Sequence, residues 1–204
     1  MKLRLGTDFD NTLVNYDGLF HRAAVERGLV PAETPPTKNS VRDHLRAVGR
    51  EAAWTRLQGL VYGSRLHEAP LFPHARACLA RMRQEGVAIF IVSHKTRFPH
   101  AGPPFDLHAA ARDWLVRQGL SHQGGIIEPQ NVYFETSLAA KLHRVATLGC
   151  HAFVDDLPEV LTHTAFPDGV QRIWFDPAGQ DNGNRALVPV RSWQEIGKSL
   201  RIAS

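Results

Sequence analysis

Cysteine and long apolar runs are the scarcest features of this sequence. Its 204 residues include two cysteines, Cys78 and Cys150, which do not have the spacing of a metal site. Two thiols are too few for the disulfide framework of a small secreted domain, so we expect a reducing, cytoplasmic location. No apolar stretch approaches the roughly 20 residues of a membrane-spanning helix, and none resembles a signal peptide. We therefore expect no membrane partner.

Repeats and clusters of like charge are also missing. The absence of an internal repeat excludes a solenoid array. The net charge is +4, but the basic residues are spread along the chain. Proteins that bind nucleic acids usually concentrate positive charge in a patch or stripe, so this pattern argues against a nucleic-acid partner and is compatible with small anionic substrates. Nothing in the sequence indicates the oligomeric state.

Short apolar runs that alternate with helical patterns make up most of the chain. Runs of this length, rich in Val, Ile and Phe, are typical of buried parallel strands. They cover Leu3 to Thr7, Val87 to Val92, Asn131 to Phe134, His151 to Val154 and Val170 to Phe175. Helices are expected at Pro73 to Glu85, Leu107 to Gln118 and Thr136 to Leu148. The alternation predicts an α/β fold, namely a three-layer, Rossmann-like parallel sheet with helices on both faces.

A helical segment interrupts this alternation between the first two strands. It contains the helical patterns Leu19 to Arg27, Ser40 to Val48 and Glu51 to Tyr62, without a strand. We predict a small helical cap at residues 17–70, and a core domain made of residues 1–16 and 71–204. A second irregular stretch, Lys95 to Asp106, contains three prolines. Long ordered loops of this kind are usually functional.

Polar residues follow three of the predicted strands. Asp8 and Asp10 follow the first strand, Ser93 follows the second, and Asp155 follows the fourth. Ligands of open parallel sheets bind beyond the carboxyl ends of the strands. Residues two apart in extended chain share a face, so one of the first two carboxylates can attack an electrophile while the other handles the proton of the leaving group. The alternative is that these acids are solvated turn residues.

Phosphoryl transfer would explain why these residue types come together. Attack of a carboxylate on a phosphate monoester requires the negative charge to be neutralised. Mg²⁺ binds hard oxygen ligands, for which Asp8 and Asp155 are candidates. Lys141, the only lysine between positions 96 and 197, is the candidate for a fixed ammonium, and Lys95 is its rival.

Three further residues are candidates for contacts with the phosphate group. The hydroxyl of Ser93 and the backbone of Asn11 would orient the phosphate oxygens. His94 follows Ser93 directly and is the histidine we expect to touch the substrate.

The order of these motifs resembles that of the haloacid dehalogenase (HAD) superfamily of phosphohydrolases. The matching segments are Asp8-Phe9-Asp10-Asn11-Thr12, Ile91-Val92-Ser93, Lys141, and Val154-Asp155-Asp156 with Glu159. The resemblance implies that Asp8 is a nucleophile that forms an aspartyl-phosphate and that Asp10 is the general acid and base. It also implies that Asp8, Asp155 and the backbone carbonyl of Asp10 surround Mg²⁺. The second acid, Asp10, is typical of the phosphatases and disfavours dehalogenation.

The fourth motif departs from the family pattern. Glu159 stands where many members have a second Asp, so metal binding could be shared among Asp155, Asp156 and Glu159. We rank Asp155 first and Asp156 second.

Specificity is expected from residues at the start of the cap and in the proline-containing loop. These residues are Tyr16, Phe20, His21, Arg22, Arg97 and His100. The sequence thus predicts a Mg²⁺-dependent phosphomonoesterase that acts on a small phosphorylated metabolite, such as a sugar phosphate or a nucleotide. The alternative is a non-catalytic or phospho-signalling module of similar fold that binds phosphate. In receiver domains, however, the acidic pair precedes the phosphorylated Asp, whereas Asp155-Asp156 comes late here.

Overall fold

The structure is a computed structural model that describes residues 2–179 and 187–200. The chain divides into two compact units. We call them the sheet unit, made of Met1–Val14, Leu71–Lys95 and Gln118–Ser204, and the helical unit, made of Asn15–Pro70 and Thr96–Arg117. None of the helices in the described part of the chain is long and apolar enough to cross a lipid bilayer.

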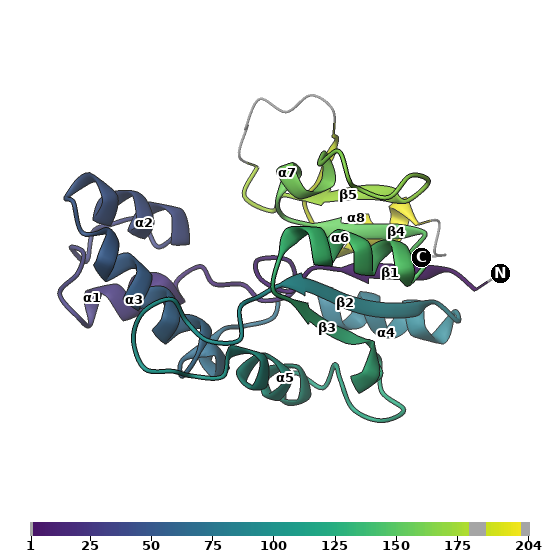
Figure 1. Ribbon diagram of the computed structural model, residues 1–204, viewed down its shortest axis with the longest axis horizontal. Helices are drawn as coiled ribbons and strands as arrows, with labels where there is room; N and C mark the ends of the chain where they lie inside the picture. Colours follow the sequence, from purple (N-terminus) through teal and green to yellow (C-terminus); the bar gives the residue numbers. More distant parts are fainter. Residues whose placement is uncertain (1, 180–186, 201–204) are drawn as a thin grey trace. The chain divides into compact units, whose positions relative to one another are not determined.

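The sheet unit contains a parallel sheet with the strand order β3-β2-β1-β4-β5-β6 (Figure 1). Its strands are β1 (Arg4–Thr7), β2 (Ala88–His94), β3 (Val132–Glu135), β4 (Ala152–Asp155), β5 (Gln171–Phe175) and β6 (Pro189–Val190). All five strand pairings are parallel. The predicted fold class is therefore confirmed.

Strand β1 lies in the interior of the sheet. Leu5 pairs with Ile89 of β2 on one side and with Ala152 of β4 on the other. Leu5, Gly6 and Thr7 are buried in this strand, as expected of a strand that is covered by helices on both faces. Asp8, which follows β1 directly, therefore leaves the sheet near its centre.

Helices cover the two faces of this sheet (Figure 1). They are α4 (Ala75–Gln84), α6 (Leu138–Thr147), α7 (Pro158–Leu161) and α8 (Trp193–Ser199). Trp174 and Phe175 are neighbours on β5 and so point to opposite faces. Trp174 joins the buried cluster that contains Leu142 of α6 and Leu161 of α7, whereas the ring of Phe175 lies 6.2 Å from that of Trp193 in α8.

Several elements of the sheet unit differ from the sequence prediction. Strand β2 does not end at Val92 but continues through Ser93 and His94, because these residues pair with Phe134 and Glu135 of β3. The elements β6, α7 and α8 were not predicted. Two of them are only two and four residues long, too short to show a hydrophobic period.

The helical unit contains α1 (Leu19–Val25), α2 (Lys38–Ala47), α3 (Glu51–Tyr62), the 3₁₀ turn η1 (Leu66–Glu68) and α5 (Leu107–Arg117). Helices α1, α2 and α3 contact one another. Their core includes an aromatic cluster in which the ring of Phe20 lies 5.8 Å from Tyr16, 5.1 Å from Trp54 and 5.5 Å from Tyr62. The three helices predicted between residues 17 and 70 therefore form.

The helical unit also includes residues 96–117, which our sequence boundary of 71–204 had assigned to the core domain. The physical reason is the packing of α5, which contacts η1 and α3. Trp114 of α5 is buried, and its indole N–H donates to the Ala69 carbonyl oxygen at 2.8 Å. The pattern of apolar residues along α5 does not indicate this long-range contact.

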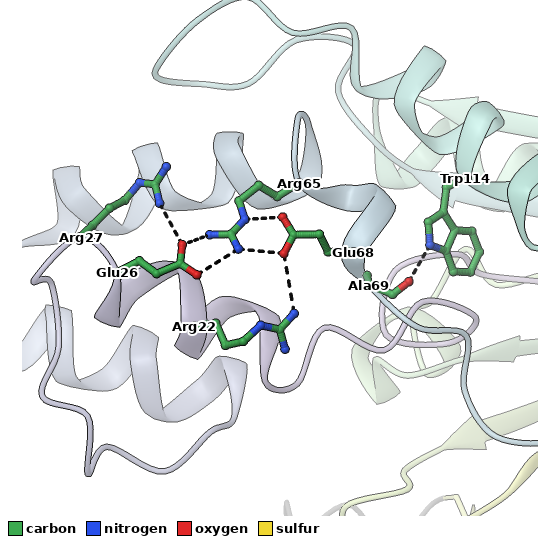
Figure 2. Close-up of polar contacts among 7 residues, drawn as sticks. All are labelled: Arg22, Glu26, Arg27, Arg65, Glu68, Ala69 and Trp114. Atoms are coloured by element: carbon green, nitrogen blue, oxygen red, sulfur yellow. Dashed lines mark hydrogen bonds and ion pairs between the residues drawn. The ribbon is translucent and has the colours of Figure 1, made fainter.

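A network of ion pairs ties the segments of the helical unit together (Figure 2). Arg65 donates to both carboxylate oxygens of Glu68 at 2.6 and 2.7 Å and also binds the carboxylate of Glu26. Arg22 lies 3.8 Å from Glu68, and Arg27 lies 3.8 Å from Glu26. The guanidinium of Arg65 thus joins the end of α1 to η1.

Candidate active site

Two buried carboxylates meet at the carboxyl ends of neighbouring strands. Asp8 follows β1, and its backbone N–H donates to the Val154 carbonyl of β4 at 2.8 Å. Asp155 is the last residue of β4 and is 0% exposed, while Asp8 is 4% exposed. The short apolar strands end at the same edge of the sheet, so the two acids converge there as the sequence predicted.

The ammonium of Lys141 lies between these two carboxylates. Its Nζ donates to Asp8 Oδ1 and to Asp155 Oδ2, both at 2.6 Å. Helix α6 places Lys141 in this position, because Ser137 caps the helix by accepting a hydrogen bond from the Ala140 N–H at 3.1 Å. Lys141 is therefore the lysine that joins Asp8 to Asp155, as the sequence analysis preferred.

Burial and charge shift the protonation of this cluster. Burial raises the pKa of Asp155 to about 6, and the nearby Asp8 acts in the same direction, while Lys141 opposes both. Burial alone would lower the pKa of Lys141, but Asp155 and Asp8 together raise it above its ordinary value. The lysine is therefore a permanent cation at neutral pH.

A third carboxylate completes the cluster. Ligand atoms of Asp8, Asp155 and Asp156 all lie within 4.8 Å of one another. The carbonyl oxygen of Asp156 accepts a hydrogen bond from the Trp174 indole at 3.2 Å, and the N–H of Leu157 donates to Asp155 Oδ1 at 3.0 Å. Glu159 is exposed and is not part of this group within the described chain. The geometry therefore favours Asp156 over Glu159.

The donor set of this cluster suits a hard divalent cation. The cluster has three carboxylates and one ammonium, which binds two of them, so negative charge is in excess there. Oxygen donors of this kind are the ligands that Mg²⁺ takes in proteins. The residues present therefore fit the metal that the sequence analysis expected.

Asp10 is bound by a different lysine. Lys95 is 4% exposed, and its Nζ donates to Asp10 Oδ1 at 3.0 Å and to Oδ2 at 2.9 Å. From the sequence, Lys95 was only a rival of Lys141, and its pairing with Asp10 was not predicted. The two lysines have separate roles, because each binds a different carboxylate of the Asp8-Phe9-Asp10 segment.

A signal for the position of Lys95 exists in its spacing from Ser93. The backbone N–H of Lys95 donates to the Glu135 carbonyl at 2.8 Å, so the chain stays extended beyond β2. Residues two apart in extended chain share a face, and Ser93 and Lys95 are both buried. His94, between them, is exposed and points to the opposite face. Its contact with substrate stays a prediction.

Asn11 begins the turn that follows the acidic pair. It has a φ of 55°, in the left-handed region that is uncommon for residues other than glycine. The turn brings the N–H groups of Leu13 and Val14 back to the Phe9 carbonyl at 3.0 and 3.1 Å. The Trp193 indole donates to the Thr12 carbonyl at 3.0 Å and holds the turn in place. The contact of the Asn11 backbone with phosphate stays a prediction.

The residues predicted to determine specificity all belong to the helical unit. Tyr16 and Phe20 are buried in its aromatic cluster, and Arg22 is exposed beside Glu68. Arg97 donates to Asp106 Oδ2 at 2.9 Å, which joins the two ends of the proline-containing loop. His21 is half-buried and His100 is exposed. Their role in specificity stays a prediction.

Comparison with known proteins identifies the fold. No family model matches the chain, and no curated protein matches its sequence. The chain is similar to a HAD phosphatase from Thermococcus onnurineus, with 17% identity, a TM-score of 0.54 and 99% of each chain covered.

Two other solved structures show the same likeness. A predicted phosphatase from Clostridium acetobutylicum has 12% identity and a TM-score of 0.60, with 98% of this chain and 99% of that chain covered. A 2-haloacid dehalogenase from Pseudomonas syringae pv. Tomato DC3000 has 15% identity and a TM-score of 0.53, with 98% and 99% covered. The chain therefore has the fold of the HAD hydrolases, as its motifs indicated.

Proposed function

We propose that this chain, with its HAD hydrolase fold, is a Mg²⁺-dependent phosphomonoesterase that acts through an aspartyl-phosphate on Asp8. Its substrate would be a small phosphorylated metabolite, such as a sugar phosphate or a nucleotide. The observation that carries this proposal is the charge of the cluster, in which Asp8, Asp155 and Asp156 lie together and the ammonium of Lys141 binds the first two. One bound divalent cation would neutralise this cluster.

The same charge balance favours phosphate ester hydrolysis over dehalogenation. A haloacid substrate carries a carboxylate, which the excess negative charge of three carboxylates against one ammonium would repel. A phosphate monoester is also anionic, but its reaction is one in which a divalent cation normally neutralises the transferring group. The carboxylate cluster has the composition that holds such a cation.

In the first step, a carboxylate oxygen of Asp8 attacks the phosphorus atom. A bond forms between this oxygen and phosphorus, and the bond from phosphorus to the ester oxygen breaks. The departing oxygen takes a proton from Asp10, which must be protonated at that moment. Lys141, 2.6 Å from Asp8, orients the nucleophile, and the hydroxyl of Ser93 would donate to a phosphate oxygen.

In the second step, water hydrolyses the aspartyl-phosphate. Asp10 removes a proton from the water as its oxygen attacks phosphorus, the bond between phosphorus and Asp8 breaks, and the free carboxylate returns. Lys95 holds the Asp10 carboxylate through two hydrogen bonds. This contact orients the carboxylate that acts as the base here.

The cation would be held by Asp8, Asp155, Asp156 and the backbone carbonyl of Asp10. When bound, it would neutralise the charge of the phosphate group and of the surrounding carboxylates.

Hydrolysis of p-nitrophenyl phosphate tests the proposal. We expect turnover with Mg²⁺, none with a chelator, and a loss of roughly a thousandfold or more in an Asp8→Asn variant of unchanged fold. Release of halide from a haloacid in the same assay, without phosphate release, would contradict the proposal.

A second measurement separates an enzyme from a phosphate-binding module. Beryllium fluoride mimics a phosphoryl group on a carboxylate, so a rise in the thermal midpoint with Mg²⁺ and beryllium fluoride, dependent on Asp8, would report binding at this site. Binding without turnover of any phosphate ester would favour the non-catalytic alternative.

A further inference from the structure

The helical unit contains a pocket of its own, of about 390 Å³. We call it the α3 pocket. It lies along α3, next to the residues that follow α1 and the proline-containing loop. The lining residues that matter here are Arg27, Arg50, Arg56, Leu57, Leu60 and Phe105. This volume falls in the range of pockets that hold small molecules.

A glycine in α3 and the glycine that follows it allow the loop to form one wall of this pocket. A Cβ atom at Gly59 would lie 2.7 Å from the Ala101 carbonyl oxygen and 2.8 Å from the Pro99 Cβ. A Cβ atom at Gly63 would lie 3.1 Å from the Cβ of Phe105. The loop therefore packs directly against the helix. This packing holds the proline-containing loop that the sequence predicted to be ordered.

The lining of the α3 pocket is positively charged. It contains three arginines and no acidic residue. Arg50 and Arg56 are exposed and form no ion pair with any other described residue. Arg27 lies 3.8 Å from Glu26, but that carboxylate is also bound by Arg65, as Figure 2 shows. The pocket therefore has positive charge available for a ligand.

The remaining lining is largely apolar. Ala53 and Leu57 are buried and form part of it, and Leu60 is half-buried. Phe105 is 45% exposed although it is a large apolar side chain. Apolar walls with a few convergent charged groups are the usual composition of small-molecule sites.

We propose that the α3 pocket is a binding site for a small organic anion with an aromatic or aliphatic body. The guanidinium groups of Arg50 and Arg56 would bind its carboxylate, sulfonate or phosphate group, since arginine forms paired hydrogen bonds with such groups. Phe105 and Leu60 would pack against its apolar part. The absence of carboxylates from the lining excludes a metal ion as the occupant. This proposal is independent of the proposed phosphatase activity.

The probe for this site is anilinonaphthalene sulfonate, which has one negative group on an aromatic body and fluoresces when it binds in an apolar pocket. We expect saturable binding by the full chain, with affinity that falls as salt is raised because the charged contacts are screened. Phenylnaphthylamine, the matched compound without the sulfonate, should bind more weakly. These measurements need neither Mg²⁺ nor a phosphate ester.

A double variant, Arg50→Gln with Arg56→Gln, tests the site directly. Both residues are exposed, so the fold should be retained, and the affinity for the sulfonate probe should fall roughly five- to tenfold. The control is Arg46→Gln, in the same unit but outside the pocket and paired with Glu51 at 2.8 Å. Phe105→Ala should weaken the binding of both compounds.

Equal affinity of the double variant, the control and the unaltered chain for the sulfonate probe would overturn the proposal. Equal binding of the charged and uncharged compounds would overturn it as well. Loss of phosphatase activity has no part in this test, so failure of this proposal and failure of the proposed function can be told apart.

Discussion

Lys95 donates two hydrogen bonds to the carboxylate of Asp10, with its Nζ 3.0 Å from Oδ1 and 2.9 Å from Oδ2. The lysine side chain is 3% exposed and that of Asp10 is 21% exposed. The contact fixes the direction of the carboxylate. In the proposed reaction Asp10 donates a proton to the departing oxygen in the first step and removes one from water in the second.

We therefore expect the effect of Asp10→Asn to depend on the leaving group. Alkyl phosphates need a proton at the departing oxygen, and turnover of such a substrate should fall about 10²- to 10⁴-fold. The departing oxygen of p-nitrophenyl phosphate leaves readily without a proton. With this substrate, the rate of aspartyl-phosphate formation should therefore fall much less. Single-turnover rates for the two substrates, measured in the variant and in the unaltered chain, give the comparison. Equal losses for both would rule out proton donation by Asp10.

Removal of Lys141 should strongly destabilise the metal-free protein. The residue is 2% exposed and lies between two buried carboxylates, so Lys141→Met would leave both without a cation. We expect the free energy of unfolding to fall by about 3–5 kcal/mol, and Mg²⁺ to restore part of it because it binds only the folded state. Urea unfolding with and without Mg²⁺ measures this.

The pH range of this effect follows from the pKa of Lys141, which is raised above its ordinary value of 10.5. Its stabilising contribution is fully present below pH 10.5 and is lost only as pH rises further. The matched control is Lys198→Met on the exposed side of α8, which should change stability by less than about 0.5 kcal/mol. If Lys141→Met lowered the free energy of unfolding by no more than the control does, the role of this lysine as the cation of the cluster would be contradicted.

Arg65 should be the residue of the helical unit most sensitive to loss of charge. Its side chain is 15% exposed and binds both Glu68 and Glu26. We expect Arg65→Met to lower the free energy of unfolding by about 1–2 kcal/mol, and Arg22→Met, with a side chain 53% exposed, by less than about 0.5 kcal/mol. Equal losses in urea unfolding would show that the network does not centre on Arg65.

The stability that this ion-pair network contributes should decrease at acid pH. The hydrogen bonds from Arg65 hold the pKa of Glu26 and of Glu68 below their ordinary value of 4.5. Their contribution is present above pH 4.5 and is lost as pH falls through the lower folded values. The difference in stability between the unaltered chain and Arg65→Met should therefore shrink below pH 4.5.

The two cysteines should differ in reactivity. Burial raises the pKa of Cys150 from 9.0 to about 11, and burial also raises that of the half-buried Cys78. Because thiolates are the reactive form, both should react slowly with a disulfide reagent at pH 8, and Cys78 should react first. Faster labelling of Cys150 would contradict this environment.

The thiol of Cys150 also predicts a loss of stability at alkaline pH. The folded state holds the proton more tightly than the unfolded state, so the contribution is complete below pH 9 and is lost as pH rises to about 11. We expect a loss of up to about 2 kcal/mol over this range, relative to Cys150→Ala measured in parallel. If the free energy of unfolding depended on pH identically in the two proteins, this role of the Cys150 thiol would be disproved.

The strand ends could be read from the sequence because their signal is local. Apolar runs followed at once by Asp8, Ser93 and Asp155 indicate parallel strands whose carboxyl ends carry polar residues, and the structure has this arrangement. The place of Lys141 followed from its being the only lysine in a long interval. The strand ends needed only the pattern of apolar runs, whereas Lys141 needed only the scarcity of lysine in that part of the chain.

Features that depend on long-range packing could not be read in this way. The Lys95 side chain binds Asp10, which is 85 residues away, and α5 groups with the helical unit through η1 and α3. The grouping of α5 leaves no mark on its own helical period, and the spacing of Lys95 from Ser93 indicates a shared face but not the carboxylate that Lys95 binds. The end of β2 was misplaced for a related reason, because its last residues pair with β3 although Ser93 is polar.

The proposed reaction requires Asp8 to receive the phosphoryl group. It is tested by quenching the enzyme in acid during turnover of a phosphate ester, reducing any acyl phosphate with borohydride and locating the modified residue by mass spectrometry. We expect homoserine in place of Asp8, dependent on Mg²⁺ and absent without substrate. Turnover with Asp8 unmodified and the label on another residue would contradict it.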